Sequence, residues 1–180
     1  MAFRYSDIKS FLERSCRAYR DDVLNLPPMP ILRSRMKLRS YQRQALRVWL
    51  DAGKRGVIVL PTGAGKTYIA LQAIQILDEP ALILVPTIDL IDQWRRHLTE
   101  QFDIEVGALG GGEELIRPLT VSTYDSASLR AEQLGNRFML LVFDEVHHLP
   151  APTYSQIAEM YVAPYRMGLT ATYEREDGAH

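Results

Sequence analysis

The stretch Leu60-Pro61-Thr62-Gly63-Ala64-Gly65-Lys66-Thr67 stands between an apolar run and a segment with helical spacing. The run before it, residues 56–60, is short and rich in β-branched side chains, which is typical of a buried parallel strand. Residues 66–77 repeat apolar side chains at helical intervals. A glycine-bearing turn placed this way aims backbone N–H groups and a helix N-terminus at an anion. The stretch therefore predicts a phosphate-binding loop in an α/β fold.

Within this loop, Lys66 is expected to reach the β- and γ-phosphates of a nucleotide, and the Thr67 hydroxyl to ligate Mg²⁺. The usual consensus has glycine five positions before Gly65, where this chain has Leu60. An ordinary glycine-rich turn with an exposed lysine is the alternative. The remaining residues expected to cradle the phosphates are Thr62, Gly63, Ala64 and Gly65.

A second informative segment, residues 143–148 (FDEVHH), ends the apolar run 138–143. Charged residues at the carboxyl end of a central strand lie where open α/β sheets bind ligands. We expect Asp144 to hold Mg²⁺ through water and Glu145 to orient or deprotonate an attacking water. The paired His147 and His148 would also suit a transition metal, although no cysteine stands nearby.

Composition favours one intracellular domain. A chain of 180 residues with 47% hydrophobic content can bury one core but is short for two nucleotide-binding lobes. The single cysteine, Cys16, cannot form an internal disulfide. Because no signal-like or membrane-length apolar segment occurs, we expect an intracellular protein with no membrane partner.

The net charge of −1 conceals an uneven distribution of charged side chains. Residues 1–55 carry a net charge of +8, and residues 56–180 carry −9. The basic part is a candidate for phosphate contacts with nucleic acid, although a solvated basic surface is the plainer interpretation. Its candidate contacts are Arg33, Arg35, Lys37, Arg39 and Arg43.

The chain divides into an appendage, residues 1–36, and a main domain, residues 37–180. Ser6 is expected to cap a helix with Ile8, Phe11, Leu12 and Tyr19 on one face, and residues 27–30 (PPMP) then force an extended connector. This appendage is too small for its own core, so we expect it to pack on the main domain or to belong to a longer N-terminal domain.

Strands and helices alternate through the main domain. Right-handed crossovers between parallel strands then give a three-layer α/β sandwich with a mostly parallel sheet and every candidate segment at a strand's carboxyl end. Thr87 is expected to cap the helix that follows it. The other expected helices span about 40–52, 126–134 and 153–161, and the other expected strands span 81–85, 104–109, 119–122, 138–143 and 166–170.

Several segments together resemble the superfamily 2 DNA helicases of the XPB type. The loop 61–67 is similar to that family's phosphate loop despite Leu60. The resemblance runs from about Leu38 to His180. Its further segments are 38–42 (LRSYQ), 84–87 (LVPT) with Gln93-Trp94, 122–124 (STY), the DExH box 144–151 (DEVHHLPA), 168–172 (GLTAT) and Arg175-Glu176-Asp177.

This resemblance implies the first RecA-like lobe of an ATP-dependent DNA helicase that uses ATP and Mg²⁺. Gln42 and Arg39 would contact the adenine. His147 would couple the nucleotide state to neighbouring loops, and Thr170 and Thr172 would relay it toward DNA.

The resemblance also implies a DNA-binding edge. Pro86, Thr87 and Thr123 lie on segments that touch the DNA backbone in the family, and Gly111 lies in a glycine triplet that allows close approach of a phosphate. Capping, loop flexibility and surface ion pairs explain Thr123, the glycines and the charged triplet equally well. The triplet implied in strand separation is Arg175, Glu176 and Asp177.

The sequence lacks a second RecA-like lobe and its arginine fingers, so we expect the chain alone to be nearly inactive. The expected partners are duplex or forked DNA, a second lobe, and a nuclease or a transcription or repair factor. The compartment would be cytoplasmic in archaea or bacteria and nuclear in eukaryotes. Two alternatives are a lobe of another superfamily 2 duplex translocase, of the restriction type, and a non-catalytic docking module for DNA or protein.

Overall fold

The structure is a computed structural model that describes residues 5–15, 18, 20, 22–148 and 151–171. Its helices are α1 (Tyr5–Arg14), α2 (Ser40–Asp51), α3 (Lys66–Leu77), α4 (Ile88–Phe102), α5 (Tyr124–Leu129), α6 (Ala131–Leu134) and α7 (Ala151–Met160), with a 3₁₀ turn, η2 (Val146–His148). Its strands are β1 (Arg55–Val59), β2 (Ala81–Val85), β3 (Gly107–Gly110), β4 (Glu113–Leu115), β5 (Leu119–Thr123), β6 (Leu140–Phe143) and β7 (Tyr165–Thr170).

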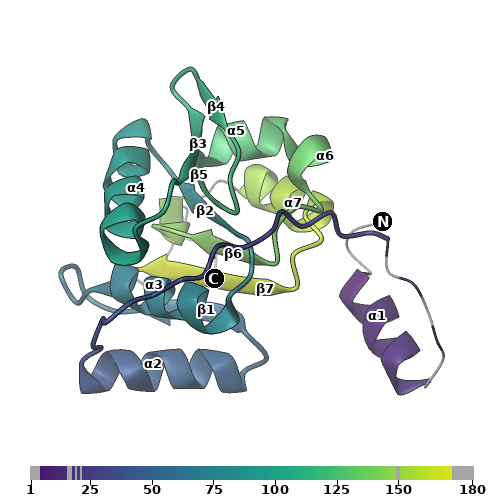
Figure 1. The fold of residues 1–180 in the computed structure, drawn as a ribbon, viewed down its shortest axis with the longest axis horizontal. Coiled ribbons are helices and arrows are strands. Elements are labelled where there is room, and N and C mark those ends of the chain that lie inside the picture. The colour runs from purple at the N-terminus through teal and green to yellow at the C-terminus, as the bar shows by residue number, and fades with distance from the viewer. Residues whose placement is uncertain (1–4, 16–17, 19, 21, 149–150, 172–180) are drawn as a thin grey trace.

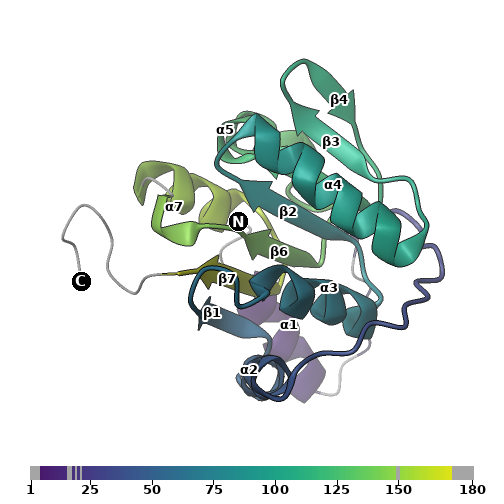
Figure 2. The same ribbon diagram turned by 90° about the vertical axis from the view of Figure 1, so that its left-hand side faces the viewer.

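A seven-stranded sheet forms the centre of the fold, in the order β1-β7-β6-β2-β5-β3-β4. All neighbouring strands are parallel except the edge pair β3 and β4. Helices α2, α3 and α4 cover one face, and α5, α6 and α7 cover the other (Figures 1 and 2). The predicted three-layer α/β sandwich with a mostly parallel sheet is confirmed.

Strand β2 shows why an unbroken apolar run marks the middle of this sheet. All five of its residues are buried. Because side chains alternate along a strand, Leu82 and Leu84 join the core under α5–α7, and Ile83 and Val85 join the core under α3 and α4. A strand packed on both faces needs apolar residues at every position.

The sheet ends in a hairpin that the sequence pattern did not predict. Strand β3 begins at Gly107 rather than Ile104, and β4 pairs with it in an antiparallel arrangement. The acidic residues of β4 have arginine partners, with Arg95 Nη1 at 3.0 Å from Glu113 and Arg130 Nε at 3.0 Å from Glu114. A short, exposed, acidic edge strand has no apolar alternation, which explains why the pattern missed it.

The helix predicted over residues 126–134 is two short helices, α5 and α6. Helix α5 already begins at Tyr124, because the Thr123 side chain accepts a hydrogen bond from the Ser126 N–H and so caps the helix. Arg130, with φ −105°, separates the two helices. The other predicted helices and strands of the main domain are confirmed within a few residues of their ends.

The appendage differs from its prediction. Helix α1 begins at Tyr5, before Ser6, and it stands at the side of the sheet domain (Figure 1). Its predicted apolar face is largely open to solvent, with Ile8 54% and Phe11 64% exposed, while Tyr19 lies outside the described residues. None of the described helices is long and apolar enough to span a membrane.

The connector after α1 is hydrogen-bonded to Asn136, in the loop between α6 and β6. The N–H of Asn25 donates to the Asn136 carbonyl at 2.9 Å, and the Asn136 amide donates to the Val23 carbonyl at 3.0 Å. Farther along, the buried Leu32 joins the core cluster that lies under α2 and α3. These contacts fix the path by which the chain reaches α2.

Candidate functional site

The candidate site lies at the carboxyl ends of three neighbouring strands, β1, β7 and β6. The predicted phosphate loop follows β1, Thr170 ends β7, and Asp144 follows β6. The N–H of Leu60 donates to the Thr170 carbonyl at 3.1 Å, so strand pairing continues into the loop. The structure therefore brings together segments that lie more than 80 positions apart.

In the phosphate loop, the buried Lys66 begins α3 and its amine donates to the carbonyls of Leu60, at 2.9 Å, and Pro61, at 3.4 Å. The lysine thus faces into the loop, which excludes the alternative of an exposed lysine. Gly63 and Gly65 both have left-handed φ values, 79° and 75°. At Gly65 the left-handed backbone would strain any larger residue, and a Cβ atom there would lie 2.5 Å from Gln42 Nε2 and displace that side chain.

Gln42 holds the loop from the side of α2. Its Nε2 donates to the carbonyls of Ala64, at 2.9 Å, and Gly65, at 3.3 Å, and its Oε1 accepts from the Arg39 N–H at 2.8 Å. The Tyr41 hydroxyl donates to the same Ala64 carbonyl at 2.8 Å. Gln42 therefore holds the phosphate loop, and Arg39 is exposed at the N-cap of α2. The expected contact of both residues with adenine stays a prediction.

The Asp144 carboxylate is held by hydrogen bonds on both of its oxygens. The Trp94 indole N–H donates to Oδ2 at 2.7 Å, and the Glu145 N–H donates to Oδ1 at 3.0 Å. Burial raises the pKa of Asp144 above its ordinary value, and the Trp94 bond and the charge of Lys66 offset this rise only in part. The positive charge of Lys66 thus acts on the Asp144 carboxylate, although the two side chains are not bonded to each other.

Helix α5 holds the backbone of this segment. The Tyr124 hydroxyl donates to the Asp144 carbonyl. Burial, with the neighbouring carboxylates of Asp144 and Glu145, raises the Tyr124 pKa, so the phenol stays protonated and remains a donor.

Glu145 adopts a left-handed backbone conformation, with φ 50°. Non-glycine residues rarely hold this conformation, and those that do gather at functional sites. Its Oε2 lies 3.4 Å from His147 Nδ1, and the same nitrogen lies 2.9 Å from Thr170 Oγ1. His147 therefore joins the ends of β6 and β7, as a relay between the two strands requires.

The residues at this edge fit a nucleotide with Mg²⁺. Thr67 follows Lys66 in the first turn of α3, and the charge of Lys66 acts on the Asp144 carboxylate. Among the residues that the structure describes, no three His, Cys, Asp or Glu side chains gather as a metal cluster. A Mg²⁺ ion here would therefore need phosphate oxygens and water besides Thr67 and Asp144.

The predicted DNA edge lies at the carboxyl ends of β2, β5 and β3, beside the nucleotide edge. Val85 at the end of β2 pairs with Thr123 at the end of β5, so the segments with Pro86, Thr87 and Thr123 are neighbours. Thr87 occupies the N-cap position of α4 as predicted, but its exposed side chain makes no capping hydrogen bond.

The glycine turn between β3 and β4 has a packing reason of its own. Gly110, Gly111 and Gly112 have φ values of 135°, 62° and 90°. A Cβ atom on Gly110 would lie 3.1 Å from Ile91, and one on Gly111 would lie 3.1 Å from Ile88. The turn therefore rests against the first turns of α4. Of the remaining predicted site residues, Thr172, Arg175, Glu176 and Asp177 lie outside the described part of the chain.

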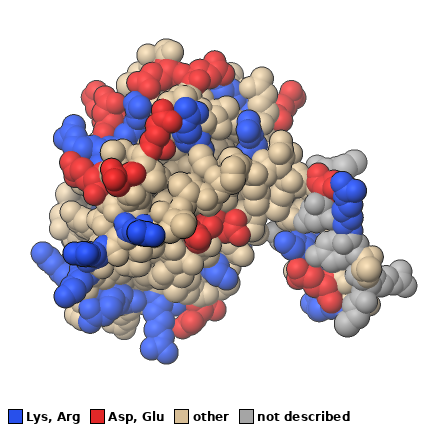
Figure 3. Space-filling model, viewed as in Figure 1, with Lys and Arg blue, Asp and Glu red and all other residues tan. Residues whose placement is uncertain are grey.

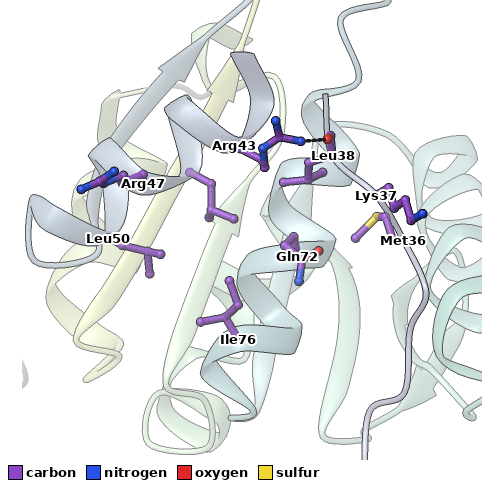
Figure 4. Close-up of a pocket in the computed structure, with 9 residues that line it drawn as sticks. Met36, Lys37, Leu38, Arg43, Arg47, Leu50, Gln72 and Ile76 are labelled. Carbon is purple, nitrogen blue, oxygen red and sulfur yellow. Dashed lines mark hydrogen bonds between the residues drawn. The ribbon is translucent and has the colours of Figure 1, made fainter. Parts of the chain in front are cut away.

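A groove of about 430 Å³ lies between α2 and α3, apart from the residues above (Figure 4). Leu50 and Ile76 contribute apolar surface, and Lys37, Arg43 and Arg47 contribute charge. Arg43 is turned toward the preceding segment, where Nη1 donates to the Leu38 carbonyl at 2.7 Å. Lys and Arg side chains gather over this end of the molecule, and many Asp and Glu side chains gather toward the hairpin (Figure 3).

Sequence reasoning missed three residues of the site, namely Tyr41, Trp94 and Tyr124. Trp94 stands in a segment that resembles the helicase family, but its contact with Asp144 spans 50 positions. Their residue types were the one signal that could have pointed to them. A buried indole N–H or phenol hydroxyl needs a hydrogen-bond partner.

Comparison with known proteins agrees with this geometry. The chain is 50% identical, over its whole length, to "DNA 3'-5' translocase XPB2" of Sulfurisphaera tokodaii, and spans 41% of that protein. It is 39% identical over 84% of its length to "DNA 3'-5' helicase XPB" of Mycobacterium tuberculosis, of which it spans 29%. The chain thus covers less than half of each relative, and the resemblance to XPB-type helicases is confirmed.

Solved structures support the fold. The UvsW helicase of bacteriophage T4 matches 99% of this chain with a TM-score of 0.67 and 21% identity, and 73% of that chain is covered. The SWI2/SNF2 ATPase core of Sulfolobus solfataricus matches 82% with a TM-score of 0.63 and 18% identity, and 34% of it is covered. Residues 35–175 match the family described as "Type III restriction enzyme, res subunit", and the chain therefore belongs to that family.

Proposed function

We propose that this chain is the ATP-binding lobe of an ATP-dependent DNA helicase or translocase of the XPB type. One observation carries the proposal: the phosphate loop and Asp144 follow β1 and β6, with only β7 between them, and His147 is bonded to Thr170 at the end of β7. The names of the relatives, DNA 3'-5' translocase and helicase, support the same reaction class.

In this proposal, Lys66 exchanges its bonds to the Leu60 and Pro61 carbonyls for the phosphates of ATP. Backbone N–H groups of the loop and of the start of α3 bind the same oxygens, and that of Ala64 first releases its bond to the Pro61 carbonyl. Thr67 and Asp144 hold Mg²⁺, which supplies positive charge against the phosphates. Glu145 orients the attacking water and accepts its proton.

The adenine end of ATP lies beside Gln42 and Arg39. His147 and Thr170 pass the state of the nucleotide across the ends of β6 and β7. DNA lies along the neighbouring edge, at Pro86, Thr87, Thr123 and Gly111, with residues 175–177 as candidates for strand separation. Duplex or forked DNA is the expected substrate, and repair or transcription-linked DNA opening is the expected role.

A second RecA-like lobe completes the site in this proposal, because arginines from across a cleft stabilise charge in the transition state. Such an arginine is worth about 10³ to 10⁵ in rate. A nuclease or a transcription or repair factor is a further proposed partner. The proposed compartment is the cytoplasm in archaea or bacteria and the nucleus in eukaryotes.

The test is steady-state ATP hydrolysis by this chain at low salt with Mg²⁺, with and without forked DNA, beside Glu145→Gln as the blank. We expect Mg²⁺-dependent binding of ATP but turnover equal to the blank. Adding the second lobe should then restore DNA-stimulated turnover. Translocation on duplex DNA without strand separation would favour a restriction-type motor instead.

Two results would count against the proposal. DNA-stimulated turnover by the chain alone, abolished by Glu145→Gln, would show that no second lobe is needed. DNA binding that ignores both ATP and Lys66→Ala would point to a docking module without catalysis.

A further inference from the structure

Trp94 connects the proposed nucleotide edge with the proposed DNA edge, which lie side by side at the carboxyl ends of the strands. It lies in α4, the helix that starts directly after Pro86 and Thr87, and its side chain is 2% exposed. Its indole N–H donates to Asp144 Oδ2 at 2.7 Å, across to the end of β6. The helix that starts at the proposed DNA edge is thereby bonded to the carboxylate proposed to hold Mg²⁺.

The bond fixes how the carboxylate is turned. The Glu145 N–H occupies Oδ1 at 3.0 Å, and the Asp144 N–H is itself bonded to the Leu84 carbonyl at 2.8 Å. With its backbone held by β2 and one oxygen held by its own segment, the remaining rotation of the carboxylate is set by Trp94. The indole is rigid and buried, so its position follows that of α4.

Helix α4 is also where a ligand on the DNA edge would act first. Trp94 lies six residues after Ile88, which corresponds to about 9 Å along the helix. The glycine turn of the β3–β4 hairpin packs on the same first turns, at Ile88 and Ile91. A displacement of this end of α4 would therefore shift the indole relative to Asp144.

Trp49 provides a matched comparison within the same chain. It is equally buried, at 3% exposed, and its indole N–H donates to the Arg166 carbonyl at 3.0 Å, away from the site. Trp49 thus shows what a purely structural tryptophan does here, which is to satisfy its N–H on the backbone. Trp94 satisfies its N–H on a carboxylate instead.

We propose that Trp94 is a positioning residue that orients the Asp144 carboxylate for Mg²⁺ and ties this orientation to the DNA edge through α4. The proposal rests on the proposed function, since it takes Asp144 to hold Mg²⁺ through water. Outer-shell groups of a metal site typically affect metal affinity by about ten- to a hundredfold. The hydrogen bond from Trp94 to Asp144 therefore responds to DNA through Trp94 and to the Mg²⁺-nucleotide through Asp144.

The first measurement uses the wild-type chain labelled with ¹⁵N. The chain has two tryptophans and therefore two indole N–H signals, assigned through Trp49→Phe and Trp94→Phe. We expect saturating ADP with Mg²⁺ to shift the Trp94 signal and to leave the Trp49 signal in place. Forked DNA, added without nucleotide, should also move the Trp94 signal.

The second measurement is ADP affinity by calorimetry, with Mg²⁺ and with EDTA. Trp94→Phe should lower the affinity for ADP with Mg²⁺ by about ten- to a hundredfold and change the affinity in EDTA less than about twofold. Trp49→Phe, which removes an indole of similar burial, should change neither value. If Trp94→Phe does not fold, the wild-type spectra still decide the question.

Two results would overturn the inference alone: ADP binding with Mg²⁺ while the Trp94 signal stays still, or equal losses of affinity in Mg²⁺ and EDTA. A Trp94 signal that responds to nucleotide but not to bound DNA would overturn the link through α4. Failure of ADP to bind under any condition would instead overturn the nucleotide site, and the inference with it.

Discussion

The Nδ1 atom of His147 lies 2.9 Å from Thr170 Oγ1, although the two residues are 23 positions apart. They follow or end neighbouring parallel strands, and the Thr170 carbonyl also receives the Leu60 N–H of the phosphate loop. Thr170 thus contacts both halves of the nucleotide site, through its side chain and through its backbone.

Thr170→Val should lower DNA-stimulated ATP turnover by roughly three- to tenfold, because it removes one hydrogen bond but keeps the shape of the side chain. ATP turnover is measured in a two-lobe protein of the relatives' length, with and without forked DNA. Thr170→Ser keeps the hydroxyl and serves as the control. Equal turnover of the Val and Ser variants would show that the contact has no role in the relay.

Lys66→Met should weaken binding of ATP with Mg²⁺ by roughly ten- to a hundredfold, since hydrogen bonds to a charged group contribute about 1.5–3 kcal/mol. Methionine retains most of the side-chain length but has no donor. Calorimetry on the isolated chain measures the effect, with Lys9→Met as the control because Lys9 lies on α1, away from the loop. An unchanged affinity would mean that the phosphates bind elsewhere.

Asp144→Asn should abolish the Mg²⁺ dependence of nucleotide binding and lower the stability of the ligand-free chain. Asparagine has a single acceptor oxygen, so it can accept from only one of the Trp94 and Glu145 N–H groups, and its own amide N–H group would face the other donor. Burial raises the pKa of Asp144, and removal of the buried charge therefore offsets part of this loss. Thermal unfolding at neutral pH in EDTA should therefore show a lower melting temperature than wild type. A melting temperature above that of wild type would show that the buried charge costs more than the lost hydrogen bond.

Glu145→Gly should be more stable than Glu145→Ala by about 1 kcal/mol. The left-handed φ of 50° costs alanine about 1–2 kcal/mol, and the greater freedom of glycine in the unfolded chain returns part of that difference. Urea unfolding of the two variants measures the gap. If alanine proved as stable as glycine, the segment would have relaxed to an ordinary backbone conformation in solution.

The ion pair between Glu105 and Arg117 should make stability depend on pH. The Arg117 hydrogen bond, at 2.6 Å, and its charge hold the pKa of Glu105 below the usual value. For a lowered carboxyl pKa, the added stability is present above the unfolded pKa, about 4.3, and is lost as the pH falls through the folded value. Glu105→Gln should therefore melt lower than wild type at pH 7 and equally at strongly acidic pH. A gap that persists in acid would assign the effect to packing.

Apolar patterning was enough to predict the layers of this fold. The runs 81–85 and 138–143 are continuous because both faces of the central strands are covered, and the phosphate loop was recognisable because its glycines and lysine are neighbours in sequence. Strand β4 escaped prediction because ion pairs with Arg95 and Arg130, rather than apolar alternation, accompany its pairing with β3.

The candidate site was predictable only in its local parts. Lys66, Asp144 and Glu145 follow from motifs, but the bond from Trp94 to Asp144 and the bonds of Tyr41 and Gln42 to Ala64 join distant segments. Such contacts depend on how helices cross the sheet, which spacing along the chain does not encode. The left-handed backbone at Glu145 likewise depends on neighbours from other strands.

Both ends of the Gln42 side chain already have partners, since its carbonyl accepts from Arg39 and its amide donates to Ala64 and Gly65. A nucleobase that accepts a hydrogen bond from Nε2 must therefore displace one of the two bonds that this nitrogen donates to the loop. Binding of a base to Gln42 and release of the phosphate loop by Gln42 are then thermodynamically linked. Inorganic triphosphate, which carries the charge but no base, would meet a loop that is still bonded to Gln42. Selectivity for the purine would therefore appear as tighter binding of the phosphates of ATP than of inorganic triphosphate.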